Sequence, residues 1–426
     1  MINRIKSVFW GSDEKQRLLS NVFSLGILQI ANYILPLVTV PYLVRVLGPE
    51  YFGLLAFATA TINYFILITD YGFNLSATRQ ISLNRDNPEK VNEIFSSVLI
   101  IKTVLMFLCL FLLILITSSI NKFSQNREVY FISFGIVVGQ ILFPVWLFQG
   151  MEKMKYIAYF NIIAKIFFTI FIFLFVKNKT DYLFVPLLTS MGFLVVGVWS
   201  LIVARRQFGV KFRLQNFTKI KFHLKEGWYV FFSSMAISLY TISNTFLLGL
   251  YTNNTNVGYF AAVERIIQGV KGLNVPISQS IYPLIGKKMQ ENKKEGIIFV
   301  RKITFLVGPV MFIFSLILFI LAEPIINIIL GSAYSNCIIP LRIMSFLPFI
   351  VSMSNIFGIQ TMLNLGYNKE FSYSVVLTAI IGFTLTLILV PLYNIIGVSI
   401  AMLLDEIFIT MMLGGFLFLK IKKGFI

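Results

Sequence analysis

The chain is a succession of long apolar runs separated by short polar or charged segments. Each run reaches the roughly 20 residues that an α-helix needs to cross the hydrocarbon core of a bilayer. Open strands cannot satisfy their backbone in lipid, so each run predicts a transmembrane helix. The pattern predicts twelve spans, at residues 19–44, 52–71, 94–118, 129–148, 156–176, 182–203, 227–250, 257–283, 303–322, 337–363, 371–391 and 396–419.

The composition supports a membrane protein. Of 426 residues, 57% are hydrophobic and 13% are charged, against about 25% charged residues in a typical soluble domain. This excludes an ordinary cytosolic enzyme and a disordered chain. The sequence has no Walker A, HExxH or GxSxG motif, and its cysteines have no metal-ligand spacing, so neither cofactor nor metal is expected. The segments between spans are also too short for a nucleotide-binding domain.

The net charge of +18 comes from 36 basic and 18 acidic residues. Of the basic residues, 26 fall in segments on the side of the two termini, five on the other side and five within the predicted spans. By the positive-inside rule this bias places both termini in the cytoplasm. The basic loops 205–225 and 287–302 are then topology signals, with contact to anionic lipid headgroups as the alternative and no nucleic-acid partner. The single histidine, His223, is interpreted as a solvated loop side chain.

An internal repeat relates the two halves of the chain. Residues 52–57 align with residues 257–262, which pairs Gly53 with Gly258, and residues 149–153 align with residues 365–369. Two six-helix lobes of the same orientation predict a parallel repeat around a central cavity; the alternative is chance similarity among apolar runs. The predicted parts are an N-terminal lobe at residues 1–204, a basic cytoplasmic linker at 205–225 and a C-terminal lobe at 226–426.

Polar residues gather on one face of several predicted helices. The clearest case is the span at 257–283, where one half of the helical wheel is polar, which is typical of a helix facing protein or water. For the spans beginning at residues 19 and 227, hydrogen bonding between helices explains the polar stripes equally well. The predicted polar cavity residues are Gln29, Asn32, Asn63, Ser238, Thr241, Asn244, Gln268 and Asn274.

Five basic residues fall within predicted spans, where each central Lys or Arg costs about 2.5–3.5 kcal/mol on the insertion scale. Lys102 and Arg342 lie near the ends of their spans and could reach the interface by snorkelling. Lys165, Arg265 and Lys271 lie deeper. Two interpretations stay open for these cations: intramembrane ion pairs that hold helices together, or a positive cavity that attracts an anionic substrate. The acidic residues within spans are Asp70, Glu264, Asp405 and Glu406.

The segment from Pro41 to Ser82 carries a recognisable motif, PYLVRVLGPEYFGLLAFATA followed by DYGFNLSATRQIS. It resembles the polysaccharide transport family of the MOP superfamily, most closely the Wzx-type O-antigen flippases. Residues 144–152 and Glu264-Arg265 with the prolines that follow also resemble this family. The resemblance implies an all-α integral membrane protein with the fold of MATE exporters and the lipid II flippase MurJ.

The resemblance implies a flippase in the bacterial inner membrane and not an enzyme. Its substrate would be an undecaprenyl-pyrophosphate-linked oligosaccharide, moved from the cytoplasmic to the periplasmic leaflet. Asp70 and Arg79 would gate the cavity or receive the headgroup, and the intramembrane cations would hold the pyrophosphate. Antiport of H⁺ or Na⁺ would use Asp70, Glu264, Asp405 or Glu406.

Three further expectations concern the partners of the protein and two alternative functions. The cavity lies within one chain, so a monomer is expected, in contact with membrane lipid and with other polysaccharide-assembly proteins. A MATE-type multidrug or cation antiporter is one alternative, although the first span has no carboxylate. A polysaccharide polymerase or ligase is another, although no outer loop exceeds about a dozen residues.

Overall fold

The structure, a computed structural model, describes residues 13–422. Within that range it leaves out the side chains at 13–27, 30, 31, 33, 34, 37, 236, 237 and 239–241. Every regular element of the described chain is a helix, which confirms the all-α prediction. Thr241, one of the predicted cavity residues, has its side chain outside the described residues.

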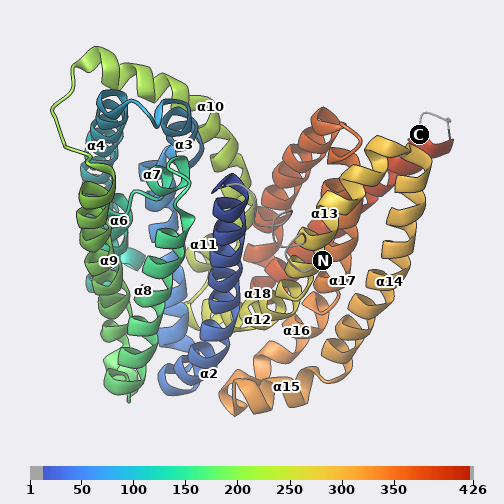
Figure 1. Ribbon diagram of the computed structural model, residues 1–426. Helices are drawn as coiled ribbons and strands as arrows, with labels where there is room; N and C mark the ends of the chain where they lie inside the picture. Colours follow the sequence, from blue (N-terminus) through green and yellow to red (C-terminus); the bar gives the residue numbers. More distant parts are fainter. Residues whose placement is uncertain (1–12, 423–426) are drawn as a thin grey trace, which may run out of the picture. The chain divides into compact units, whose positions relative to one another are not determined.

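The chain folds into two compact units whose boundaries cut through helices. Unit 1 contains residues 13–39 and Ala58–Met235, whereas unit 2 contains Val40–Phe57 and the chain from Ala236 onward. The first ten elements in chain order (Figure 1) are α2 (Asp13–Asp70), α3 (Phe73–Asn84), α4 (Pro88–Ser119), α5 (Asn121–Ser124), α6 (Arg127–Leu142), α7 (Val145–Gly150), α8 (Met154–Phe175), η1 (Lys179–Leu183), α9 (Phe184–Phe208) and α10 (Phe217–Thr241).

The remaining elements include one π-helix, η3. In chain order they are α11 (Ser243–Tyr251), α12 (Asn254–Gly272), α13 (Asn274–Glu291), α14 (Lys293–Ile320), α15 (Ala322–Ile329), η2 (Ser332–Cys337), α16 (Ile338–Met344), α17 (Leu347–Asn355), η3 (Ile356–Leu363) and α18 (Asn368–Lys422).

Eight helices among the described residues are long and apolar enough to cross a membrane, so the chain is a multi-pass membrane protein. They cover nine of the predicted spans, because α18 contains two. Its backbone turns at Asn394 (φ 51°), and α2 likewise turns at Gly48 (φ 70°). The spans predicted at 227–250 and 257–283 are helical but do not belong to these eight, and the span predicted at 19–44 is helical but lies largely among residues whose side chains are not described. The total of twelve therefore stays a prediction.

Unit 1 is a helical bundle with an aromatic core. Trp146 and Phe148 of α7 are fully buried, and Phe148 packs against Phe160 of α8 and Phe208 of α9. The short helix α7 therefore fixes the ends of its neighbours. Pro144 separates α7 from α6, because proline cannot donate the hydrogen bond that would continue the helix.

The helix α10 packs across one end of the unit 1 bundle, beside α3 and α4 (Figure 1). Phe231 stacks on Tyr71 with ring centroids 4.9 Å apart. A Cβ at Gly227 would lie 2.9 Å from the carbonyl oxygen of Tyr71, so glycine allows this close approach. His223 is 2% exposed on the same inner face. The interpretation of His223 as a solvated loop residue is therefore wrong, because the linker forms a docked helix.

Unit 2 repeats local features of the first half of the chain. Asn87 caps α4 by accepting a hydrogen bond from the backbone N–H of Lys90, and Asn292 caps α14 by accepting one from Lys294. Two compact apolar clusters support this unit, one between α13, α14 and α17–η3 and one between η3 and α18. The division at residues 204 and 226 into functional lobes stays a prediction.

Candidate functional site

The clearest candidate site in unit 1 is built around Lys165. This lysine lies near the middle of α8, and its Nζ donates a hydrogen bond to Oδ1 of Asn32 on α2. Lys165 and Asn32 were predicted from different spans, and the structure brings them together. An amide oxygen satisfies one donor of the ammonium group without neutralising its charge. The contact therefore holds the ammonium group of Lys165 between α8 and α2.

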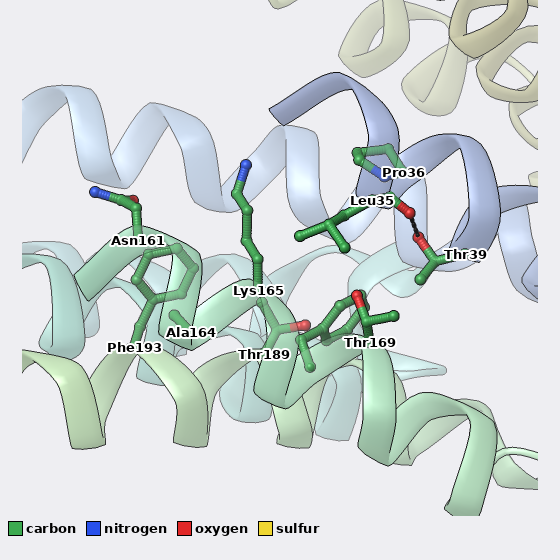
Figure 2. Close-up of a pocket in the computed structure, with 10 residues that line it drawn as sticks. Leu35, Pro36, Thr39, Asn161, Ala164, Lys165, Thr169, Thr189 and Phe193 are labelled. Atoms are coloured by element: carbon green, nitrogen blue, oxygen red, sulfur yellow. Dashed lines mark hydrogen bonds between the residues drawn. The ribbon is translucent and has the colours of Figure 1, made fainter. Parts of the chain in front are cut away.

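A cavity of about 200 Å³ opens beside Lys165, between α2, α8 and α9. Figure 2 shows Lys165 and Asn161 extending from the same side of α8, as their spacing of four residues requires. The lining is mostly apolar, which raises the electrostatic influence of the single lysine. The cavity is lined by Leu35, Pro36, Thr39, Asn161, Ala164, Lys165, Phe168, Thr169, Thr189 and Phe193.

A buried ion pair joins two other predicted residues of unit 1. Nζ of Lys102 on α4 lies 2.7 Å from Oδ1 of Asp70, at the end of α2, and the Lys102 side chain is 2% exposed. Asn74 donates to the other carboxylate oxygen of Asp70 at 3.1 Å. Snorkelling is therefore wrong for Lys102, because the carboxylate binds it inside the bundle. Arg79, the other predicted gate residue, is exposed on α3.

In unit 2 the helix α12 carries a chain of polar contacts along one face. Gln268 donates to Glu264 at 3.1 Å, and Arg265 donates to Gln268 at 3.4 Å. These contacts follow from the i, i+3 and i, i+4 spacing, which puts the three side chains on neighbouring positions of the helix surface. Lys271 is half-buried one turn further along, and Asn274 is buried at the start of α13.

The remaining predicted residues of unit 2 are distributed over three helices. Thr386 of α18 donates to Asn244 of α11 at 2.9 Å. Asp405 is 4% exposed and lies against Gly382, where an added Cβ would meet Oδ1 of Asp405 at 2.5 Å. Glu406 is half-buried beside it in sequence, and Arg342 is exposed on α16.

Three further predicted cavity residues lie on α2 and α10. Gln29, Asn63 and Ser238 are each half-buried. A cavity shared by the two sets of residues stays a prediction, as do the roles of the individual side chains.

Sequence reasoning missed one polar network in unit 2. Ser278 of α13 donates to Asn355 at 2.6 Å, and Gln360 of the π-helix donates to the hydroxyl and the carbonyl oxygen of Ser278. Single π-turns inside helical segments are frequent at functional sites. The hydrophobic pattern gives no signal for a π-turn. The helical wheel already places Ser278 on the polar half of the predicted span at 257–283, but it gives no sign of its partners Asn355 and Gln360.

Comparison with known proteins places the chain in a family. Residues 18–289 match the family described as "Polysaccharide biosynthesis protein". The chain belongs to this polysaccharide biosynthesis family. It is 36% identical to the "Putative O-antigen transporter" of Escherichia coli (strain K12) over 396 residues, which cover 93% of this chain and 95% of that protein. A relative of the same description from Shigella dysenteriae is 31% identical, over 92% of this chain and 98% of that protein.

Solved structures of the MOP superfamily share the fold of this polysaccharide biosynthesis protein. An inward-facing MATE multidrug resistance transporter matches with a TM-score of 0.69 at 12% identity, over 94% of this chain and 98% of that chain. The lipid II flippase MurJ matches with a TM-score of 0.68 at 17% identity, over 93% of this chain and 86% of that chain. These TM-scores show a common fold and confirm the MATE- and MurJ-like architecture expected from the sequence.

Proposed function

We propose that this protein is a transporter and not an enzyme, specifically a flippase for lipid-linked oligosaccharide. It carries an undecaprenyl-pyrophosphate-linked repeat unit from the cytoplasmic to the periplasmic leaflet of a bacterial inner membrane, with both termini in the cytoplasm. The observation that carries the proposal is the similarity to an O-antigen transporter over 93% of the chain. The fold shared with the lipid II flippase MurJ is consistent with such transport.

The physical problem of this transport is the polar headgroup. Neither the sugars nor the pyrophosphate can enter hydrocarbon without a large desolvation cost. A cation within the bundle can offset that cost for the pyrophosphate, and Lys165 beside an open cavity fits this role. In unit 2, Arg265 and Lys271 serve the same purpose. The polyprenyl chain remains in lipid while the headgroup passes by alternating access.

The ion pair of Lys102 with Asp70 supports a role at the gate. Asp70 comes directly before the turn at Tyr71 and Gly72, where both residues have positive φ. A change in this turn would move α3 relative to α2 and separate or restore the pair. If H⁺ or Na⁺ drives the cycle, we propose Glu264, Asp405 and Glu406 as the coupling groups in unit 2.

The test is transport in a bacterial strain that lacks its own O-antigen flippase. The gene for this protein, supplied with the assembly genes of its own source, should restore surface polysaccharide. Without it, lipid-linked single repeat units should accumulate on the cytoplasmic leaflet. Leaflet location is read by accessibility of the sugar to a glycosidase added to spheroplasts or to inverted vesicles.

The same assay separates the rival functions. A MATE-type antiporter would leave no lipid-linked intermediate when it is removed. A polymerase or ligase would leave single repeat units on the outer leaflet. Either result would contradict the proposal.

A further inference from the structure

A second cavity lies at the end of unit 1 that α10 covers, away from Lys165. Its volume is about 420 Å³, and it separates the start of α4 from the linker before α10. The lining is almost entirely polar. It consists of Asn87, Glu89, Lys90, Asn92, Glu93, Arg213, Leu214, Gln215 and Lys219.

Hydrogen bonds hold the linker side of this cavity in place. The backbone N–H of Lys211 donates to Oδ1 of Asn92 at 2.7 Å, and that of Arg213 donates to the hydroxyl of Ser96 at 3.0 Å. Ser96 in turn donates to the carbonyl oxygen of Lys211 at 3.4 Å. The extended linker is thereby fixed along α4, and the cavity wall exists before any ligand binds.

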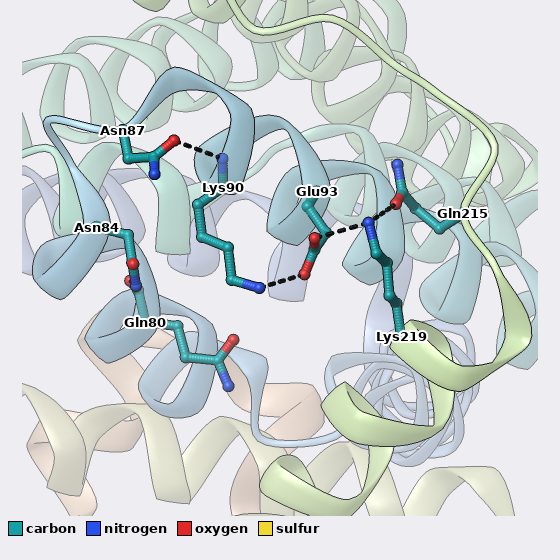
Figure 3. A network of polar contacts seen from close by, with 7 residues as sticks. All are labelled: Gln80, Asn84, Asn87, Lys90, Glu93, Gln215 and Lys219. Atoms are coloured by element: carbon teal, nitrogen blue, oxygen red, sulfur yellow. Dashed lines mark hydrogen bonds and ion pairs between the residues drawn. The ribbon is translucent and has the colours of Figure 1, made fainter.

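The cavity has an excess of positive charge. Glu93 is shared by two lysines, since Nζ of Lys90 lies 2.6 Å and Nζ of Lys219 lies 2.8 Å from its carboxylate oxygens (Figure 3). Arg213 adds a third cation, whose side chain is exposed. Glu89 is a second carboxylate in the lining, so three cations stand against two carboxylates and the excess is one positive charge. The linker at 205–225 contains seven basic residues and no acidic one. Such a site favours an anion.

Exposed apolar side chains flank the cavity. Leu214, which lines it, is 87% exposed, and Phe212 and Phe217 on either side are 56% and 73% exposed. Further along α10, Trp228, Tyr229 and Phe232 are also exposed. A soluble anion would not need these apolar neighbours. An aromatic and basic surface on a membrane protein is typical of the lipid interface.

We propose that this cavity binds the headgroup phosphate of an anionic phospholipid, with Arg213 as the main ligand and the acyl chains against Leu214 and Phe217. The inference uses the proposed cytoplasmic location of this end of unit 1, where anionic lipid attracts basic segments. It does not depend on the proposed transport of oligosaccharide.

The test measures lipid retained by the purified full-length protein in native mass spectrometry after exchange into mixed phosphatidylglycerol and phosphatidylcholine. Wild-type protein should retain phosphatidylglycerol selectively. Arg213→Gln should weaken that retention by about tenfold or more, since it removes a charge-assisted hydrogen bond. Arg206→Gln is the matched control, because Arg206 is exposed on the same linker but does not line the cavity. Equal retention in both variants would overturn the proposal.

Two further arms identify the ligand. Leu214→Asn keeps the charge and should reduce phosphatidylglycerol retention through loss of the apolar contact alone. Soluble glycerol phosphate at the same concentration should not compete; competition would assign the cavity to free phosphate esters. Selective retention of undecaprenyl pyrophosphate over phosphatidylglycerol would assign it to the substrate path instead. Because binding is measured without transport, failure here leaves the flippase proposal standing, and failure of transport leaves this one standing.

Discussion

Gly53 and Gly258 pack against each other, backbone to backbone, where α2 meets α12. A Cβ at Gly53 would overlap the carbonyl oxygen of Asn254, and a Cβ at Gly258 would overlap that of Pro49. Pro49 and Asn254 are separated by the same 205 positions as the two glycines. Pro49 and Asn254 therefore correspond to each other in the repeat, as the two glycines do. Gly53 packs on Asn254, and in the same way Gly258 packs on Pro49. This reciprocity is a local two-fold relation between the two backbone segments.

The first prediction concerns this contact. Gly258→Ala should destabilise the protein by about 1–3 kcal/mol or more, because the new methyl group would force the two helices apart. The measurement is thermal unfolding of the purified protein in detergent. Gly415→Ala is the control, since no heavy atom lies within 4 Å of a Cβ at that position of α18. Equal unfolding temperatures for the two variants would contradict the close packing.

The second prediction concerns Lys102 and Asp70. Lys102→Met should lower the free energy of unfolding by about 3–5 kcal/mol, because it leaves a partly buried carboxylate without its cationic partner. Solvent screening of Asp70 reduces this loss. Asp70 is 27% exposed, so we expect the lower end of that range. The double variant Lys102→Met with Asp70→Asn should recover most of the loss in a double-mutant cycle.

The control for this cycle is Lys287 with Glu291, an exposed pair 3.8 Å apart. Such pairs contribute about 0–1 kcal/mol. If the double variant of Lys102 and Asp70 were as unstable as the worse single variant, the pair would not be coupled.

The hydrophobic pattern predicted the helices well but not the contacts between them. Lys165 and Asn32 could be predicted as inward-facing because each interrupts an apolar run, yet their direct contact depends on how α2 and α8 pack. The partner of Asn244, Thr386, lies 142 positions away and is one of many hydroxyls in apolar runs. His223 was misjudged for a related reason. Charge alone assigned this segment to a loop and could not predict which of its side chains are buried. In the structure the segment belongs to the helix α10, one face of which packs on Tyr71.

The third prediction concerns Lys165. Lys165→Met should lower transport by roughly tenfold to a hundredfold, which corresponds to the loss of one hydrogen bond to a charged group. The variant should still fold, because the cavity beside residue 165 can accept the methionine side chain. Lys155→Met, at the exposed start of the same helix, should leave transport near the wild-type level. The measurement is the amount of surface polysaccharide in the complementation strain, normalised to protein in the membrane. Wild-type activity in Lys165→Met would remove Lys165 from the proposed pathway.

The last prediction is a pH dependence that comes from His223. Burial lowers the pKa of this histidine below its ordinary value; Glu93 and Glu226 partly oppose the shift, whereas Lys90 and Lys219 add to it. The unfolded chain then binds the proton more readily than the folded chain. The stability is fully present above the unfolded pKa of about 6.5 and is lost as the pH falls towards the folded pKa.

Acidification from pH 7.5 to 5.5 should therefore weaken the packing of α10 on unit 1. The free energy of this packing should fall by at most about 1.4 kcal/mol per pH unit. The measurement is hydrogen exchange of the α10 amides in lipid nanodiscs at several pH values, corrected for the intrinsic rate. His223→Leu should remove this part of the pH dependence, because His223 is the only histidine in the chain. Identical pH profiles for wild type and variant would show that the imidazole does not titrate against the docked helix.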